Sequence, residues 1–256
     1  MKLATWNVNS LNVRLPHVLE WLTANQPDVL CLQETKLEDS KFPYAALREA
    51  GYEAVHDGQK TYNGVAILSR YPLAEPVMGM TAFEDPQKRI VSASVEDIRV
   101  ICAYFPNGQA VGSEKFQYKL RWLEAFRLWL QAELIRYPKL VLLGDYNIAP
   151  EDRDVHDPKA WEGMVHVSEP EREAFRKLIG LGLFDAFRLF EQTEKAYSWW
   201  DYRMGAFRRN LGLRIDHILV SEPLKKGCLS CSIDIIPRKL ERPSDHTVVV
   251  LELSNP

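Results

Sequence analysis

The sequence feature that most restricts the fold is a series of short apolar runs, separated by turn residues and by amphipathic segments. Each run has the length and the β-branched and aromatic content that are typical of a strand. The runs are LATWNV, DVLCLQ, GVAILS, RIVSASV, RVICAYF, KLVLLGDY, RIDHILV, CSIDII and TVVVLEL. Because helical segments lie between some of these strands, we expect an α/β or α+β protein.

Three segments between the runs carry helix signals. Apolar residues recur at intervals of three and four over 113–135, which places them on one helix face, and Ser113 is suited to cap its start. Ser168 and Glu171 have the spacing of a capping box at the start of a second helix. A further helix is expected over Leu15–Asn25.

The connections favour mixed sheets within one domain. RIVSASV and RVICAYF are separated only by a short turn around Glu96 and Asp97, which indicates antiparallel pairing. A mixed sheet, or two sheets packed together with helices outside, therefore fits better than a purely parallel sheet. No linker-like stretch or short-period repeat interrupts the sequence, so we expect a single domain over 1–256.

The overall charge excludes one broad mode of nucleic-acid binding. The 32 Lys and Arg residues against 35 Asp and Glu residues give a formal net charge of −3. A protein held to DNA by bulk positive charge would be basic, so strong non-specific coating of DNA is excluded. Local capture of a strand by a basic segment next to an acidic metal site stays open.

Export signals are lacking, and together with the cysteine pattern this favours a cytoplasmic protein that binds no membrane. No stretch approaches the roughly 18 apolar residues of a membrane span, and MKLATWNVNS does not resemble a signal peptide. Cys31 and Cys102 lie in apolar runs and are expected to be reduced core thiols. Cys228 and Cys231 form a lone CxxC without the additional ligands of a zinc site, so we expect a structural role.

Several apolar runs end in polar residues. These residues are Asn7 and Asn9 in TWNVNS, Glu34 in LCLQE, Asp145 and Asn147 in VLLGDYN, Asp216 in LRID, and Asp245 and His246 in PSDHT. An unpaired buried carboxylate is very costly, so the residues either converge on one polar site or are each satisfied locally as caps or turns. The number of such endings favours convergence, since α/β proteins place their sites at strand ends.

The chemistry of these side chains favours a hard divalent cation. Carboxylate and amide oxygens suit Mg²⁺ or Mn²⁺ better than zinc. Such a cation beside a His–Asp pair is suited to phosphoester hydrolysis, in which phosphate charge is neutralised and a side chain transfers protons. The sequence has no Walker A motif and no GxSxG motif, which argues against nucleotide-driven phosphoryl transfer and against an α/β-hydrolase esterase.

Taken in order, the motifs resemble those of the exonuclease III family of DNA-repair nucleases, part of the endonuclease/exonuclease/phosphatase superfamily. The resemblance runs from TWNVNSLNVR through LQETKL, YNGVAILSR, YFPNG, GDYNIAP, SWWDYR and LRIDHILVS to PSDHTVV, which is essentially the whole chain. LQETKL and GDYNIAP, followed by LRIDH and SDH, are highly specific together. The resemblance implies a four-layered α/β sandwich, with two mixed β-sheets packed face to face and helices outside.

The resemblance also implies roles in metal binding and proton transfer. Glu34 resembles the principal metal-binding carboxylate of the family, supported by Asn7 and by Asp245. Asp145 resembles the residue that activates the attacking water or protonates the leaving group, and Asn147 resembles its orienting neighbour. The implied cofactor is Mg²⁺, with Mn²⁺ as the alternative.

Other residues resemble the groups that face the phosphate. His246 resembles the histidine at the scissile phosphate, and Asp216 the carboxylate that fixes its tautomer. Tyr104 resembles the tyrosine that hydrogen-bonds this phosphate, although alone it reads as a strand-end aromatic, and Asn107 follows as a substrate-contact candidate. His217 also neighbours Asp216, but adjacent strand residues point to opposite faces, so His246 is preferred.

A locally aromatic and basic stretch is the candidate DNA surface. Trp199, Leu213 and Ile215 resemble the family's apolar pocket for a flipped-out sugar, with plain core packing as the alternative. Clustered arginines in the same stretch suit a phosphate-tracking loop. They are Arg203, Arg208, Arg209 and Arg214. Lys36 and Arg89 are further phosphate-contact candidates, or else solvated surface residues.

One residue departs from the family pattern. His166, in GMVHVSEPER, occupies a loop position that is usually small in members that cut at abasic sites. Near the sugar pocket, a histidine would narrow the path of a flipped abasic nucleotide or stack on a DNA end, and the alternative is an exposed loop histidine. The first interpretation predicts reduced abasic-site cleavage with 3′-end processing retained.

The leading functional hypothesis is a Mg²⁺-dependent phosphodiesterase of base excision repair that acts at 3′ ends of duplex DNA. It would be a 3′→5′ exonuclease, 3′-phosphatase and 3′-phosphodiesterase, working as a monomer on double-stranded DNA with 3′ ends, nicks or abasic sites. The close alternative is a full apurinic/apyrimidinic (AP) endonuclease. The Arg-rich SWWDYR region disfavours a small-molecule or lipid phosphatase, and the intact set of implied catalytic residues disfavours a non-catalytic nucleic-acid-binding protein.

Overall fold

The computed structural model describes residues 1–81 and 83–254. Two six-stranded sheets and a two-stranded ribbon form its framework. The first sheet has the order β13 (Cys228–Asp234), β14 (Val248–Leu253), β1 (Lys2–Asn7), β2 (Val29–Gln33), β4 (Val65–Ser69), β3 (Glu53–Asp57). The second has the order β5 (Ala74–Met78), β6 (Ile90–Val95), β7 (Ile98–Tyr104), β8 (Leu140–Asp145), β12 (Asp216–Ser221), β9 (Leu183–Asp185). The ribbon consists of β10 (Trp199–Trp200) and β11 (Gly212–Leu213).

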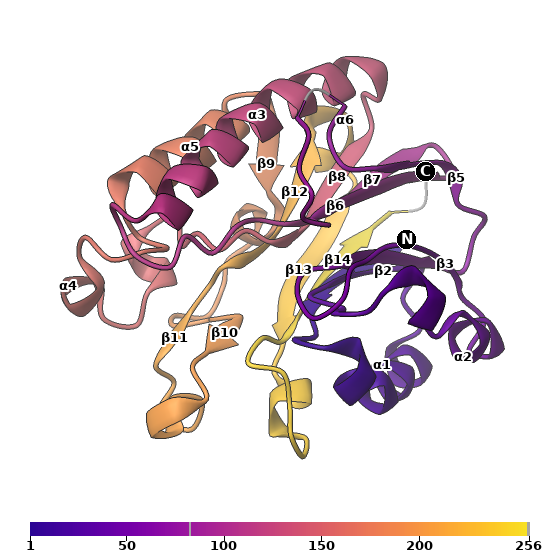
Figure 1. Ribbon diagram of the computed structural model, residues 1–256, viewed down its shortest axis with the longest axis horizontal. Helices are drawn as coiled ribbons and strands as arrows, with labels where there is room; N and C mark the ends of the chain where they lie inside the picture. The colour runs from indigo at the N-terminus through magenta and orange to yellow at the C-terminus, as the bar shows by residue number, and fades with distance from the viewer. Residues whose placement is uncertain (82, 255–256) are drawn as a thin grey trace.

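Helices cover the outer face of each sheet (Figure 1). The long helices α3 (Glu114–Arg136) and α5 (Glu169–Ile179) lie across the second sheet, whereas α1 (Leu11–Asn25) and α2 (Tyr44–Glu49) lie across the first. The short helices are α4 (Pro158–Trp161) and α6 (Glu222–Lys225). Both sheets are mixed, since β1 pairs parallel to β2 and antiparallel to β14, and β7 pairs parallel to β8 and antiparallel to β6. The predicted four-layered α/β sandwich is therefore confirmed.

The strands are continuously apolar because each sheet is covered on both faces. In β1, Leu3 points into the core between the sheets, whereas Trp6 packs on the side of α1 and α2. In β2, Cys31 likewise points into the core between the sheets, and Leu30 packs on the side of α1 and α2. All four thiols of the chain are free, and those of Cys31 and Cys102 are buried, as predicted.

The helix starts follow the capping signals of the sequence. The Ser113 hydroxyl accepts a hydrogen bond from the backbone N–H of Phe116 over 3.1 Å and caps α3. The capping box of Ser168 and Glu171 opens α5. The first helix begins at Leu11 rather than at the predicted Leu15, since the side chain of Leu11 is itself buried in the core. Among the helices that the structure describes, none has the length and apolarity to cross a membrane.

Strand pairing brings the polar strand ends to one edge of the sandwich. Because β1 and β2 are parallel, Asn7 and Glu34 leave the first sheet at the same end. In the second sheet, Asp145 lies opposite Tyr104 of β7 on one side and opposite Asp216 of β12 on the other. The two sheets therefore deliver their polar ends towards each other.

Gly144 allows the close approach of β7 and β8 just before this edge. A Cβ atom at Gly144 would lie 1.8 Å from the carbonyl oxygen of Ala103, which no side chain would tolerate. Glycine at this position therefore lets β8 deliver Asp145 into the space between the sheets.

Candidate active site

The amide of Asn7 joins carboxylates from the two sheets. Its Nδ2 donates to Oε1 of Glu34 and to Oδ2 of Asp145, each over 2.9 Å. Asn7 and Asp145 are buried, whereas the Glu34 side chain remains 19% exposed. One neutral side chain therefore holds two acids together, with the open side of the site at Glu34.

Asp145 lies in surroundings that favour its protonated form. Burial raises the pKa of Asp145 to about 7, and the charge of Asp216 adds to this, while His246 and the hydrogen bond from Asn7 oppose it. The backbone N–H of Asn147 donates to Oδ1 of Asp145 over 2.9 Å. A positioned carboxyl group that titrates near neutrality is suited to accept or donate a proton during a reaction.

His246 and Asp216 form the predicted pair. Nδ1 of His246 donates to Oδ2 of Asp216 over 2.9 Å, and its Nε2 lies 3.6 Å from Oδ2 of Asp145. Burial alone would lower the pKa of His246, but the two carboxylates outweigh burial and raise it to about 10. The ring is therefore an imidazolium at neutral pH and offers Nε2–H as a donor.

His217 takes no part in this pair. Its Nε2 donates to the carbonyl oxygen of Ile148 over 2.8 Å, and its Nδ1 accepts from Arg214 over 3.0 Å. Burial, with the charge of Arg214, lowers the pKa of His217 to about 4. The ring is a neutral, satisfied core histidine, as strand alternation indicates.

Tyr104 stands beside Glu34 with a hydroxyl that keeps its proton. Burial first and the Glu34 carboxylate second raise the pKa of Tyr104 well above its usual range. The Arg89 guanidinium lies 4.8 Å from the centroid of the Tyr104 ring, and Nη1 of Arg89 donates to the Tyr104 carbonyl oxygen over 3.2 Å. Arg89 is 8% exposed, so it supports Tyr104 rather than standing in open solvent.

Lys36 and Asn9 close the rim next to Glu34. Nζ of Lys36 lies 3.0 Å from Oε2 of Glu34 and also donates to Oδ1 of Asn9. Nδ2 of Asn9 and Nε1 of Trp199 each donate over 3.0 Å to a different carboxylate oxygen of Asp245. Both oxygens of Asp245 are thus already hydrogen-bonded within the protein.

A divalent cation fits best between Glu34 and Asp145. Ligand atoms of Glu34, Asp145 and His246 lie within 4.8 Å of one another. The protonated ring of His246 has no free lone pair for a metal, so Glu34 and Asp145 would be the direct ligands of such a cation. Hard carboxylate oxygens suit Mg²⁺, which leaves its other positions to water and phosphate. Of the other predicted ligands, Asn7 touches both carboxylates, whereas Asp245 lies against Asn9 and Trp199.

The structure brings the predicted sugar-pocket residues together in one apolar cluster. Trp199, Leu213 and Ile215 pack with Ala149, Val155, Trp161 and Val167. Leu213 and Ile215 are buried, so Trp199 and Trp161 supply the accessible surface of this cluster. Asp245, which binds Trp199, links the cluster to His246 next to it in the chain.

His166 is buried beside this cluster and is not an exposed loop histidine. Its ring centroid lies 6.4 Å from that of Trp161 and 6.5 Å from that of Trp199. Nδ1 of His166 donates to the carbonyl oxygen of Asn147 over 2.7 Å. Burial lowers the pKa of His166 to about 4, so the ring is neutral. Its position connects the apolar cluster directly to the loop after Asp145.

The arginines of the SWWDYR region divide into two groups. Arg203, Arg208 and Arg209 are exposed on the loop between β10 and β11. Arg214 is 1% exposed and pairs with Asp154 over 2.7 Å and with Asp185 over 2.8 Å. The prediction that Arg214 belongs to the phosphate-tracking surface is therefore wrong, since strand alternation between Leu213 and Ile215 turns it towards two buried acids.

Ser198, which the sequence did not predict as a site residue, and Asn107, which it did, both hydrogen-bond to residues of the site. The Ser198 hydroxyl donates to Oδ2 of Asp216 over 2.6 Å and accepts from the backbone N–H groups of Ile215 and Asp216, each over 3.1 Å. Asn107 donates through Nδ2 to Oδ1 of Asn147 over 3.2 Å. Ser198 is the first residue of the SWWDYR stretch, but only its contact with Asp216 distinguishes it from an ordinary turn serine.

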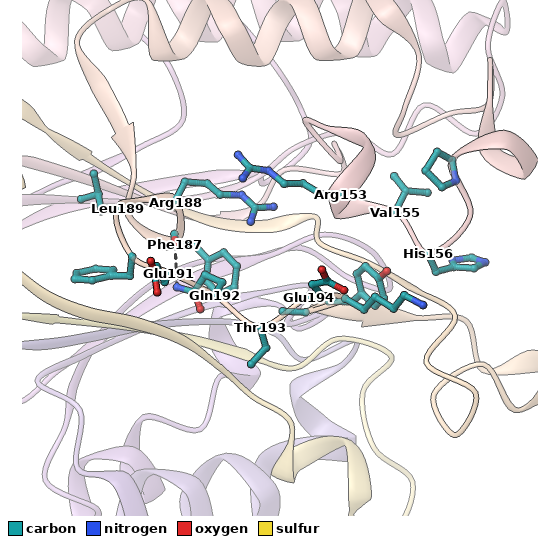
Figure 2. Close-up of a pocket in the computed structure, with 15 residues that line it drawn as sticks. Arg153, Val155, His156, Phe187, Arg188, Leu189, Glu191, Gln192, Thr193 and Glu194 are labelled. Carbon is teal, nitrogen blue, oxygen red and sulfur yellow. Dashed lines mark hydrogen bonds between the residues drawn. The ribbon is translucent and has the colours of Figure 1, made fainter.

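A cavity of about 820 Å³ lies outside the catalytic group (Figure 2). It is bounded by residues 187–197 and by the loop that carries Arg153 and His156. Both arginines that line it already have acidic partners, because Arg188 pairs with Asp154 and Arg153 with Glu151. The cavity contains none of the catalytic or metal-binding candidates.

The chain is similar over its length to known nucleases and phosphatases. Residues 4–246 match the endonuclease/exonuclease/phosphatase family. The chain is 38% identical to an exodeoxyribonuclease III of Haemophilus influenzae, over 98% of this chain and 99% of that protein. Its structure is similar to that of a 3′ phosphatase from Neisseria bound to a product DNA hairpin, with a TM-score of 0.98, 48% identity and 100% coverage of both chains. An AP endonuclease from Archaeoglobus fulgidus gives a TM-score of 0.96, with 42% identity and 100% coverage of both chains.

Proposed function

The chain belongs to the exonuclease III family, within the larger endonuclease/exonuclease/phosphatase family, and from this premise we propose that it is a Mg²⁺-dependent DNA-repair enzyme. It acts at the 3′ ends of duplex DNA as a 3′→5′ exonuclease, 3′-phosphatase and 3′-phosphodiesterase. The observation that carries the proposal is the meeting of Glu34, Asp145 and the Asp216–His246 pair at one edge of the sandwich. Relatives named as an exodeoxyribonuclease III and a 3′ phosphatase support this substrate class.

Glu34 and Asp145 would hold the divalent cation, and Asn7 keeps their carboxylates together. When bound there, Mg²⁺ neutralises phosphate charge and stabilises the negative charge that develops on oxygen. Burial raises the pKa of Asp145 to about 7 before a cation binds, and the ionised carboxylate accepts the proton of the attacking water. Asn147 fixes the Asp145 carboxylate through its backbone N–H and through Nδ2, over 2.9 Å and 3.3 Å.

Two protonated groups bind the phosphate. The His246 imidazolium donates from Nε2 to a phosphate oxygen, while Asp216 holds Nδ1 and keeps the ring oriented and charged. The Tyr104 hydroxyl is a second donor, because burial and Glu34 keep its pKa high. Preorganised donors of this kind favour the more highly charged transition state over the bound ester.

His166 favours terminal 3′ groups in this site and reduces cutting at internal abasic sites. Its buried ring lies between Asn147 and the two tryptophans of the apolar cluster, where a flipped abasic sugar would have to enter. Full AP endonuclease activity is the alternative, and the likeness to an Archaeoglobus AP endonuclease favours it. The ring position of His166 is the reason that we place 3′-end processing first.

The deciding experiment is a substrate panel. Duplexes with a recessed 3′ end, a 3′-phosphate at a nick, and an internal abasic site are incubated with Mg²⁺, with Mn²⁺ and with chelator. We expect metal-dependent release of nucleotides and phosphate from the first two, and slower cutting of the third. Activity that persists in chelator, or no activity at 3′ ends, contradicts the proposal, whereas efficient cutting of the third supports the AP endonuclease alternative.

We also propose that the enzyme works as a monomer in the cytoplasm. The residues of the site all come from one chain, and the free thiols suit a reducing compartment. Light scattering that gives twice the chain mass at working concentrations would contradict the monomer.

A further inference from the structure

A fully buried ion pair lies beneath the catalytic loops. It joins Lys119 of α3 to Glu171 of α5, and both side chains have 0% exposure. Burial lowers the pKa of Lys119, and the neighbouring charge of Glu171 opposes this. A buried ion pair is weak evidence for net stability, because desolvation offsets the Coulomb attraction. Its hydrogen bonds show instead what the pair holds in place.

Lys119 is bound to two loops of the active site. Its Nζ donates to the carbonyl oxygen of Asn147 over 2.8 Å and to that of Asn107 over 3.2 Å. With Glu171 as the third acceptor, every N–H of the ammonium group has a partner. Asn147 is the residue that fixes the Asp145 carboxylate. Lys119 therefore contacts Asp145 indirectly, through one intervening residue, Asn147.

Glu171 binds the loop that carries His166. Its Oε1 accepts from the backbone N–H of His166 over 3.0 Å, and its Oε2 accepts from the backbone N–H of Ser168 over 3.2 Å and from the Ser168 hydroxyl. The carbonyl oxygen of Asn147 accepts from both Lys119 and the His166 ring. The ion pair therefore connects the catalytic loop and the His166 loop through shared acceptors.

The stem of Lys119 is also tightly packed. A Cβ atom at Gly108 would lie 3.1 Å from Cδ of Lys119 and 3.2 Å from Cγ2 of Val165. The turn after Asn107 thus packs at Gly108 against both Lys119 and Val165, which precedes His166. Hydrogen bonds and packing together leave little freedom to any of the three loops.

We propose that Lys119 and Glu171 are positioning residues, which hold Asn107, Asn147 and His166 in one arrangement and thereby set both the turnover rate and the discrimination between 3′ ends and internal abasic sites. The kinetic part of this inference rests on the proposed function. The positioning itself is independent of that function, because it can be measured without substrate.

The test compares substitutions at two buried cationic residues, one in α3 and one in β7. Lys119→Met keeps most of the side-chain length and removes all three donors. Arg99→Met is the matched control, because Arg99 is 1% exposed and pairs over 3.5 Å with Glu133 of α3 but touches no residue of the site. Lys119→Arg keeps charge and donors and serves as the conservative rescue. Where Lys119→Met does not fold, Glu171→Gln replaces it, because it removes the charge at constant shape.

Hydrogen exchange of the folded protein is the first measurement. We expect backbone amides in 105–109, 145–149 and 164–168 to exchange about tenfold faster or more in Lys119→Met, and unchanged in Arg99→Met. Equal exchange in the two variants overturns the positioning role. This measurement decides the role even where the wild-type chain fails to process 3′ ends, an outcome that contradicts only the proposed function.

Kinetics are the second measurement. Displacing a catalytic group by about 1 Å costs about 10²-fold, so we expect kcat for 3′-phosphate removal to fall about 10²-fold, with KM changed less than about threefold. Because His166 is released as well, incision of an internal abasic site relative to 3′-phosphate removal should rise about tenfold. Lys119→Arg should restore both values. An unchanged ratio, or equal kcat losses in Arg99→Met, overturns the kinetic proposal.

Discussion

Nδ1 of His246 donates to Oδ2 of Asp216 over 2.9 Å, and both side chains are buried where the two sheets meet. Burial disfavours a charged ring, yet the pKa of His246 is raised to about 10 by Asp216 and Asp145. At neutral pH the histidine is therefore a cationic donor and not a base. Asp145 is therefore the group that accepts a proton. His246 is the hydrogen-bond donor and Asp145 is the base.

Asp216→Asn should convert His246 into an ordinary histidine. Without the carboxylate, the pKa of His246 falls towards its usual value of about 6.5, so the imidazolium is lost as pH rises through a lower range. Activity near neutral pH should drop by about 10²- to 10⁴-fold, and the alkaline limb of the rate profile should move to lower pH. The profile of kcat/KM against pH for 3′-phosphate removal checks both. An alkaline limb that stays in place contradicts the role of the pair.

Glu34→Ala should remove the response to the metal. Asp145 is then the acid that remains in the cation site. Because burial raises its pKa to about 7, this carboxyl group is partly protonated and should bind Mg²⁺ weakly without Glu34. Because a bound cation contributes several kcal/mol, the rate should fall by at least about 10²-fold at physiological Mg²⁺. Magnesium titration of the activity, with circular dichroism as the folding control, provides the measurement. Near wild-type activity in Glu34→Ala would exclude this residue as a ligand.

Asp145 should impose an acid limb that depends on the metal. Before a cation binds, burial places the pKa of Asp145 at about 7, and the proton must leave for the carboxylate to act as a base. An adjacent divalent charge favours the ionised form and lowers this pKa. The acid limb of the rate profile should therefore move to lower pH as Mg²⁺ increases. An acid limb whose position does not change with Mg²⁺ concentration would show that Asp145 does not bind the cation.

His166→Ser should widen the entrance to the apolar cluster. Lys119 still donates to the carbonyl oxygen of Asn147, so the catalytic loop should keep its place. We expect incision at an internal abasic site to rise about tenfold or more, with 3′-phosphate removal within about threefold of wild type. His156→Ser is the matched control, since His156 lies 6.3 Å from the Trp161 ring and lines the cavity outside the catalytic group. Efficient abasic-site cutting by the wild-type chain, or an equal rise in the control, contradicts this role.

Local patterns of the sequence were enough to predict the layers and the centre of the site. Continuous apolar runs mark strands that are covered on both faces, and the caps at Ser113 and Ser168 mark the helices that cover the second sheet. The polar strand ends converge as expected, because parallel pairing brings Asn7 and Glu34 to the same end of the first sheet and the second sheet presents Asp145 to them.

Contacts between distant segments could not be predicted in this way. The hydrogen bond from Asn9 to Asp245 joins residues 236 positions apart and depends on the pairing of β1 with β14 in the first sheet. The Lys119–Glu171 pair depends on how α3 packs against α5, which no local spacing encodes. The edge strand β5 is mostly exposed, and its sequence AEPVM contains a proline and shows no regular alternation of apolar and polar side chains. The orientation of Arg214 follows from strand alternation next to Leu213 and Ile215. Grouping Arg214 with its neighbouring arginines by charge alone gave the wrong prediction.

The arginines of the SWWDYR region should therefore give two different phenotypes. Replacing exposed Arg208 or Arg209 by Ala should raise KM and lower the salt dependence of kcat/KM, with a log–log slope smaller by about 0.9 for each DNA phosphate that the protein no longer neutralises. Replacing Arg214 by Ala should instead destabilise the fold by about 3–5 kcal/mol, because Asp185 loses its buried partner and Asp154 keeps only Arg188. Salt titrations of the kinetics and thermal unfolding separate the two effects, with Arg203→Ala as a further exposed comparison. A salt effect for Arg214→Ala with unchanged thermal stability would contradict its assignment to the core.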